Sequence, residues 1–363
     1  MEQKTLAQRL HIDVPLLFGV LLLCGMGLVI LYSAGGQDMD VVIRQGVRML
    51  IAVILMFAVA QITPTQLERW SMWVYLGGVL LLIVVLYTGY IGKGAQRWLD
   101  LGLFRFQPSE IMKLAVPMAV AWFVASSNLP VKLGRVIIAC ILIMVPVVLI
   151  AKQPDLGTAL LVTIAGLSVL FIAGISWRLI TVLILSAGAA APLLWHFMHD
   201  YQKRRVLMFF DPEQDPLGSG YHIIQSQIAI GSGGIYGKGW LNGTQSHLEF
   251  LPERSTDFIF AVYSEEFGLM GAILLLSIYL FVIGRGLTIA MSAQQTYGKL
   301  LAAGLILTFF VYVFVNIGMV IGQLPVVGIP LPLISQGGTS LVTLMLAFGI
   351  LMSINTNRRM LSD

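Results

Sequence analysis

Long apolar runs separated by short polar segments recur from one end of the chain to the other. The hydrocarbon core of a bilayer is about 30 Å thick and takes about 20 helical residues to cross. Ten runs approach or reach that length, at residues 14–33, 48–62, 72–90, 110–127, 135–151, 157–174, 178–197, 257–285, 299–321 and 339–354. The pattern predicts an all-α, polytopic integral membrane protein with about ten transmembrane helices.

The polar segments between these runs are short, with one exception. Residues 199–256 form a long segment that is predicted to be a single extracytoplasmic loop. Loops of this length in compact proteins usually carry a function. No polar stretch is long enough to bury a core of its own, so residues 1–363 are predicted to form one membrane domain.

Composition supports the membrane prediction and excludes several classes of protein. Hydrophobic residues make up 58% of the chain and charged residues 11%, whereas soluble domains contain about 25% charged residues. The net charge of +4 comes from cations spread between apolar runs, without the basic stripe and interleaved aromatics of a nucleic-acid-binding surface. The two cysteines form no disulfide framework or zinc-binding spacing. No nucleic-acid partner is therefore expected.

The cations in the short loops predict the orientation of the chain. With an even number of spans, both termini lie in the cytoplasm, and every cytoplasmic segment carries at least one Lys or Arg. These cytoplasmic cations are Lys4, Arg9, Arg69, Lys132, Arg135, Arg178, Arg285, Lys299, Arg358 and Arg359. The total Lys and Arg count does not favour this orientation, which therefore rests on the short loops.

A second set of cations lies on or near the predicted outer face, against the usual bias. Its members are Lys93, Arg97, Arg105, Lys113, Lys152, Lys203, Arg204, Arg205, Lys238 and Arg254. One interpretation is that an outer surface retains so many cations because it binds an anionic substrate. The alternative is that each cation neutralises a nearby acid, such as Glu110 or Asp155.

The strongest local signal is the run from Phe250 to Glu266, where the long loop re-enters the membrane. Glu253, Arg254 and Asp257 follow one another there, and Asp257 is predicted to open the eighth helix, with Ser255 and Thr256 as possible caps. A carboxylate at this position can act as a general base that takes a proton from a sugar hydroxyl. The alternative is an ordinary acid at a helix N-terminus.

Ionisable residues also occur inside predicted spans, where they are costly and usually face a partner or a polar cavity. Glu265 and Glu266 lie about two turns deeper in the eighth span and are predicted to pair with polar groups of neighbouring helices. Glu110 and Lys113 are three residues apart, hence on one helical face. Pro108 suits the start of their helix.

Two further polar segments are assigned to the same outer side. Residues 93–100 contain Lys93 and Arg97, and residues 151–158 place Lys152 and Asp155 around a proline in a compact turn. The glycine-rich run at 231–240 lacks the spacing of an ATP-binding loop and is predicted to be a tight turn, although such backbone can also bind an anion.

These motifs resemble a known family. They are KGAQRWL at 93–99, FQPSE at 106–110, QPDLG at 153–157, GYHIIQS at 220–226, FLPERSTDFIF at 250–260 and PLPLIS at 330–335. The chain is identified as a member of the SEDS family (shape, elongation, division and sporulation), closest to its RodA-type elongation branch. One departure is Gln336, which stands where the family usually has a tyrosine.

The resemblance implies a peptidoglycan glycosyltransferase of the bacterial inner membrane, active in cell elongation and rod-shape maintenance. It implies that lipid II is polymerised into β-1,4-linked glycan on the periplasmic face, with Asp257 as the catalytic residue. The substrate-binding residues proposed with it are Lys93, Arg97, Glu110, Lys113, Lys152, Asp155, Arg204, Arg205, Glu253 and Arg254. The expected partners are a class B penicillin-binding protein, other elongation-complex proteins and membrane lipid.

No cofactor is required by the sequence. A divalent cation, Mg²⁺ or Mn²⁺, can share in stabilising a leaving pyrophosphate, but no ligand cluster in the sequence demands one. Two other functions stay open at this point: a lipid II flippase or other transporter of lipid-linked precursor without covalent chemistry, and a non-catalytic scaffold. The concentration of polar motifs on one side disfavours a carrier, which needs comparable chemistry near the midplane or on both sides.

Overall fold

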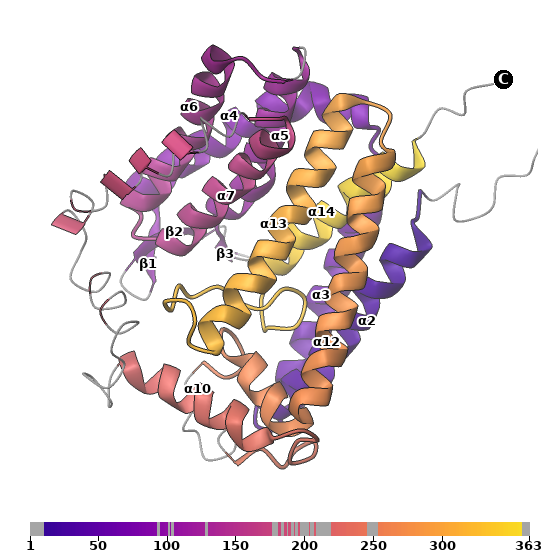
Figure 1. Cartoon of the computed structure of the whole chain (residues 1–363), viewed down its shortest axis with the longest axis vertical. Coiled ribbons are helices and arrows are strands. Elements are labelled where there is room, and N and C mark those ends of the chain that lie inside the picture. Colours follow the sequence, from indigo (N-terminus) through magenta and orange to yellow (C-terminus); the bar gives the residue numbers. More distant parts are fainter. Residues whose placement is uncertain are drawn as a thin grey trace, which may run out of the picture.

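A computed structural model of the chain describes residues 11–92, 95–100, 102, 105–127, 130–175, 219–244 and 253–357, with isolated residues between 181 and 207. The described helices of ten or more residues are α2 (Val14–Ala34), α3 (Met39–Ala60), α4 (Pro64–Thr88), α5 (Pro108–Ala125), α6 (Leu133–Lys152), α7 (Leu156–Ile172), α10 (Ser219–Gly233), α12 (Ile259–Ser292), α13 (Thr296–Val320) and α14 (Thr339–Thr356) (Figure 1).

The prediction of a polytopic helical membrane protein is confirmed. Eight of the described helices are long and apolar enough to cross a membrane, and α7 is a shorter apolar helix of 17 residues. These nine helices coincide with nine of the ten predicted spans. The remaining predicted span, residues 178–197, lies largely outside the described residues.

Three helices extend well beyond the predicted spans. α3 begins at Met39 and α4 at Pro64, whereas α12 continues to Ser292. Hydropathy placed the first two starts too late because polar and charged residues occupy the first turns. Those turns are nevertheless helical because they are well capped: the Asp38 carboxylate accepts a hydrogen bond from the amide of Asp40 at 2.8 Å.

A small antiparallel sheet, which the sequence did not predict, follows α4. Its strands are β1 (Tyr90–Gly92), β2 (Ala95–Asp100) and β3 (Arg105–Phe106), in that order, with Leu99 opposite Phe106. The sheet contacts the ends of α4 and α5. It therefore places β2, which carries Arg97, over the start of α5.

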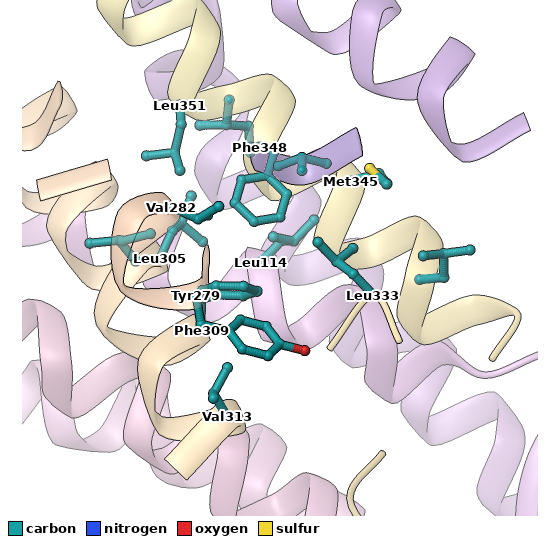
Figure 2. Close-up of a cluster of buried hydrophobic side chains, with 14 of the residues drawn as sticks. Leu114, Tyr279, Val282, Leu305, Phe309, Val313, Leu333, Met345, Phe348 and Leu351 are labelled. Atoms are coloured by element: carbon teal, nitrogen blue, oxygen red, sulfur yellow. The ribbon is translucent and has the colours of Figure 1, made fainter. Parts of the chain in front are cut away.

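The bundle has central and peripheral helices. Most of the apolar span of α5 and of α13 is buried inside the protein, whereas α3, α4 and α6 bury less than a third of theirs. A packed aromatic cluster joins the central helices: the Phe309 ring lies 5.9 Å from that of Tyr279 and 5.2 Å from that of Phe348 (Figure 2). The Tyr279 hydroxyl donates to the carbonyl of Pro332 at 2.6 Å, so this core also holds the loop between α13 and α14.

Polar contacts define one end of the bundle. Arg285, near the end of α12, pairs with Asp13 at 2.6 Å, and Asn355, near the end of α14, donates to the same carboxylate at 2.6 Å. His11 and Thr356 are also hydrogen-bonded. The two ends of the described chain therefore meet at one end of the bundle, as an even number of spans requires. α10 lies across the opposite end (Figure 1).

Candidate functional site

The segment that carries Asp257 is held by its backbone. Asn316 of α13, which is fully buried, donates to the carbonyl of Asp257 at 2.9 Å and to that of Ile329 at 2.7 Å. A buried amide that satisfies two carbonyls at once fixes both segments relative to α13. Sequence reasoning missed Asn316, whose only signal is an amide inside an otherwise apolar span.

The loop between α13 and α14 holds the two residues before Asp257. The Ser335 hydroxyl donates to the carbonyl of Thr256 at 2.5 Å, and the backbone amide of Gln336 donates to the carbonyl of Ser255 at 2.8 Å. The contact at position 336 thus uses the main chain. An aromatic side chain is not needed for this hydrogen bond, which is consistent with Gln336 replacing the family's usual tyrosine.

The start of α12 differs from the prediction. The helix begins at Ile259, with Phe258 as its N-cap and no side-chain cap, so Asp257 precedes the helix and Ser255 and Thr256 do not cap it. The carbonyls of Ser255 and Thr256 instead bind the loop between α13 and α14. Because the helix dipole acts mainly within the first turn, Asp257 lies at the edge of its influence. Its side chain is half-buried.

His222 of α10 packs against this segment. Its ring stacks on that of Phe258 with centroids 5.8 Å apart and planes inclined by 17°. Burial lowers the pKa of His222 below its ordinary 6.5, and the nearby Glu253 carboxylate partly opposes that shift. The Nδ1 atom has no hydrogen-bond partner among the described residues.

This environment predicts a pH dependence of stability. The unfolded chain binds the His222 proton more readily than the folded protein does, so the stability contributed by neutral His222 is present above pH 6.5 and is lost as the pH falls below it. His222→Phe keeps the stack on Phe258 and removes the titration. We expect the thermal unfolding midpoint to fall less between pH 7.5 and 5.5 in His222→Phe than in wild type. Parallel curves for the two proteins would contradict this prediction.

Arg97 and Asp155 are brought together as part of a compact polar turn. The Arg97 guanidinium donates to the carbonyls of Gln153 (Nε to O, 3.2 Å) and Pro154, and lies 3.7 Å from the Asp155 carboxylate. Asp155 is buried, caps α7 through the amide of Thr158, and accepts from Gln107 at 2.9 Å. Arg97 and Asp155 therefore fit the alternative interpretation, in which a cation neutralises a nearby acid.

Glu110 and Lys113 also pair, and they do so in the interior. The Lys113 Nζ lies 2.6 Å from Glu110 Oε1, and both side chains are less than a tenth exposed. The ammonium lies 5.2 Å from the centre of the Tyr312 ring. A cavity of about 30 Å³ adjoins Lys113 and Tyr312, and a smaller one joins Tyr312 to Ser335. The pair is thus connected through Tyr312 to the loop that holds the Asp257 segment.

The remaining predicted substrate-binding residues have different positions. Lys152 is exposed at the end of α6, and Glu253 is exposed in the turn before Asp257. Arg254 is half-buried, with its guanidinium beside Gly36. Lys93, Arg204 and Arg205 lie outside the described residues.

A second carboxylate cluster lies two turns into α12. Glu265 is fully buried, and its Oε1 accepts from Lys238 Nζ at 2.8 Å and from the amide and hydroxyl of Thr244 at 2.8 and 2.9 Å. Glu266 accepts from the Ser33 hydroxyl of α2. Glu266 thus pairs with a neighbouring helix, as predicted, whereas Lys238 and Thr244, the closest partners of Glu265, lie in the segment after α10. Lys238 was not predicted as the partner of Glu265, because 27 residues separate them.

The glycine-rich turn after α10, at residues 234–239, supplies the backbone hydrogen-bond partners that are missing where α12 is kinked. At the kink, Gly268 adopts φ +63°, and the carbonyls of Glu265 and Glu266 bind the amides of Lys238 and Gly239 at 3.0 and 2.9 Å. In an uninterrupted helix they would bind the amides of residues 269 and 270. Those two amides donate instead to the carbonyls of residues 234 and 235. The turn is therefore an integral part of α12 and not a phosphate loop.

This docking requires glycine at the contact points. A Cβ on Gly233 would lie 2.1 Å from the carbonyl oxygen of Ser264, whereas a Cβ on Gly231, in the same helix, would meet nothing within 4 Å. We expect Gly233→Ala to lower the free energy of unfolding by about 1–3 kcal/mol, and Gly231→Ala to be neutral or slightly stabilising. Thermal unfolding of the purified variants tests this. Equal midpoints for the two variants would show that the turn does not dock as described.

Among the residues that the structure describes, no group of three His, Cys, Asp or Glu side chains is placed to hold a metal ion. The described part of the site therefore offers carboxylates, ammonium and guanidinium groups and backbone amides.

Comparisons with known proteins agree with this picture. The family model for the cell cycle proteins FtsW, RodA and SpoVE matches residues 13–360. The chain is 54% identical to the peptidoglycan glycosyltransferase MrdB of Escherichia coli K12, over 99% of this chain and 98% of that protein. It is 40% identical to MrdB of Helicobacter pylori 26695, over 94% of this chain and 89% of that protein.

Solved structures share the fold. A chain of a peptidoglycan synthase complex that coordinates polymerization and crosslinking superposes with a TM-score of 0.83 at 30% identity, covering 95% of this chain and 98% of that one. The crystal structure of the Rod shape determining protein RodA of Thermus thermophilus gives a TM-score of 0.73 at 27% identity, covering 96% and 98%. With its motifs, its helical bundle and a family match along nearly its whole length, this chain belongs to the SEDS family of FtsW, RodA and SpoVE cell cycle proteins.

Proposed function

We propose that this chain is an inverting peptidoglycan glycosyltransferase that polymerises lipid II, with Asp257 as its general base. The observation that carries the proposal is the way in which the backbone around Asp257 is held. Three hydrogen bonds to the carbonyls of residues 255–257 come from Asn316, Ser335 and Gln336, so the segment that carries the half-buried carboxylate is held in place through its backbone. A catalytic group must be held in a fixed position by the residues around it, and these backbone contacts supply that support.

In the proposed reaction, Asp257 takes the proton of the 4-hydroxyl of the terminal GlcNAc on the acceptor. That oxygen attacks C1 of MurNAc on the lipid-linked donor from the face opposite the leaving group, so the configuration inverts to a β-1,4 bond. The C1–O bond to undecaprenyl pyrophosphate breaks as the new bond forms, and the bonding electrons leave with the pyrophosphate. Cations stabilise this growing charge; Arg97, Lys113, Arg204, Arg205 and Arg254 are proposed for that role.

The proposed orientation uses the same arrangement. Asp257 precedes the start of α12 and lies beside α10, whereas Arg285, which pairs with Asp13, lies near the other end of α12. With both termini in the cytoplasm, Asp257 faces the periplasm, where the polymer is assembled. Other elongation-complex proteins are proposed partners, the first being a class B penicillin-binding protein that supplies transpeptidation. A divalent cation, Mg²⁺ or Mn²⁺, remains a proposed aid to the leaving pyrophosphate.

The flippase alternative rests on the ionisable residues inside the bundle. Of these, Glu110 pairs with Lys113, Glu265 with Lys238, and Glu266 with Ser33. The contacts of Glu265 and Glu266 join different segments, and the Glu110–Lys113 pair is buried within α5. Such paired groups are more typical of structural anchoring than of a site that must release its partners during alternating access. The polymerase proposal is therefore preferred.

One experiment separates the two functions. The protein is purified with its class B partner, the partner's transpeptidase site is blocked with a β-lactam, and purified lipid II is added. Glycan polymer that is digested by lysozyme supports the polymerase. If no polymer forms, and lipid II moves to the opposite leaflet of liposomes that contain the protein, the polymerase proposal is wrong and the flippase function replaces it.

A further inference from the structure

A long apolar groove lies between α4 and α6, on the outside of the bundle. Its volume is about 700 Å³, and the described residues that line it are all apolar. Those on α6 recur at intervals of three and four residues and so form one continuous face. They include Leu133, Ile137, Cys140, Ile141, Met144 and Val148. Val79 and Ile83 form the opposite wall on α4.

The two walls are held at a fixed spacing. The Tyr75 hydroxyl of α4 donates to the carbonyl of Leu142 on α6 at 2.8 Å, near the middle of the groove. At one end, the Gln153 side chain donates to the carbonyl of Leu82 at 3.1 Å. Both contacts are buried or partly buried, so the groove is a built feature of the fold rather than a gap between loosely packed helices.

The length of the groove distinguishes between possible occupants. Leu149 lies 16 residues after Leu133 on α6, so the groove is about 24 Å long at 1.5 Å per residue. One leaflet contributes only about half of a hydrocarbon core of about 30 Å. The acyl chain of a phospholipid therefore covers only part of the groove, whereas a polyprenyl chain is long enough to follow all of it.

The charges at its two ends indicate where a head group would lie. Gln153 closes the groove at the end nearest the candidate site. The Arg97 Nε donates a hydrogen bond to the carbonyl of Gln153 at 3.2 Å. Lys152, three residues beyond Leu149, is exposed at the same end. At the other end, Lys132 is exposed, and the Arg135 guanidinium donates to Ser126 at 3.1 Å and lies over the Phe123 ring. The Lys152 end is distinguished by lying beside the candidate site. A lipid whose phosphate lay beside Lys152 and Arg97 could therefore place its hydrocarbon chain directly along the apolar groove.

We propose that the α4–α6 groove binds the polyprenyl chain of the lipid-linked substrate, with its pyrophosphate beside Lys152 and Arg97. This rests on the proposed function and adds a location for the lipid tail. Binding of the tail here anchors the substrate to a peripheral face of the bundle while its sugar head extends towards the Asp257 segment.

Photo-crosslinking tests the site independently of activity. The purified protein in nanodiscs is irradiated with a polyprenyl phosphate that carries a benzophenone in its chain, and the labelled peptides are identified. We expect label in residues 133–149, competed by undecaprenyl pyrophosphate but not by phosphatidylglycerol. Label spread over all lipid-facing helices, or equal competition by phosphatidylglycerol, would show ordinary bilayer lipid and overturn the proposal.

A matched pair of variants tests the same site through kinetics. Ile141 lines the groove and is 55% exposed; Ile51, in the middle of α3, is 50% exposed and does not line it. Both face lipid, so tryptophan at either position leaves the interior packing unchanged. We expect Ile141→Trp to raise the KM for lipid II about tenfold, without raising that for a lipid II analogue with a short tail. Ile51→Trp should change neither.

The outcomes separate this proposal from the function on which it rests. Label in the groove without polymer from wild type would retain the polyprenyl site and reject the polymerase. Polymer from wild type with unchanged kinetics in Ile141→Trp would retain the polymerase and reject the groove as the site of the tail.

Discussion

Asp257→Asn is expected to abolish glycan polymerisation while leaving the protein folded. Loss of a general base lowers a rate by about 10²–10⁴-fold. The hydrogen bonds that hold this segment use the carbonyls of residues 255–257, which the substitution does not change. The measurement is the initial rate of polymer formation from lipid II by the variant purified with its class B partner, alongside its thermal unfolding midpoint.

Asp40→Asn is the matched control for Asp257→Asn. Asp40 is an exposed carboxylate in the first turn of α3, outside the candidate site, and undergoes the same chemical change. It should polymerise at close to the wild-type rate. Polymerisation by Asp257→Asn at the rate of this control would remove Asp257 from the reaction, and another group would have to accept the proton.

Lys113→Met is expected to destabilise the protein strongly, because it leaves the Glu110 carboxylate buried without its cation. Removing one partner of a buried ion pair typically costs about 3–5 kcal/mol, whereas replacing both partners with apolar residues is often neutral. The double variant Glu110→Met, Lys113→Met should therefore regain most of the lost stability. Thermal unfolding of the wild type, both single variants and the double variant forms a complete double-mutant cycle.

The same four proteins distinguish a structural pair from one that also acts on the substrate. A double variant that is stable but makes no polymer would assign Lys113 a role in stabilising the leaving pyrophosphate. A double variant that is stable and active would show that the pair serves the fold alone. A Lys113→Met protein as stable as wild type would contradict the buried, ionised pair itself.

The order of the helices and the position of the candidate catalytic acid could be predicted from the sequence. Apolar runs of sufficient length identify spans because a bilayer offers the backbone no hydrogen-bond partners, so a crossing segment must satisfy its own. Asp257 stood out because charges are rare in this chain and several occur together where the long loop ends. These are local properties, which neighbouring residues determine without reference to the rest of the chain.

Hydropathy was less informative about helix ends and about the small sheet. Polar first turns concealed the true starts of α3 and α4, since capping by Asp38 and by Thr63 with Gln66 is a matter of a few side chains and not of mean hydropathy. The strands between Tyr90 and Phe106 are too short to carry a periodic signal. Both features depend on individual hydrogen bonds.

The sequence by itself determined which segments cross the membrane, that they form one family-specific bundle, and which carboxylate ends the long loop. Only the tertiary structure decided which helices are central, since α5 and α3 are both apolar runs although one is mostly buried and the other mostly faces lipid. It also decided that Asn316 holds Asp257 and that Lys238 neutralises Glu265. The physical reason is that lipid is as apolar as the interior of the bundle, so hydrophobicity does not distinguish the two faces of a helix. Contacts between distant segments emerge only when the helices pack.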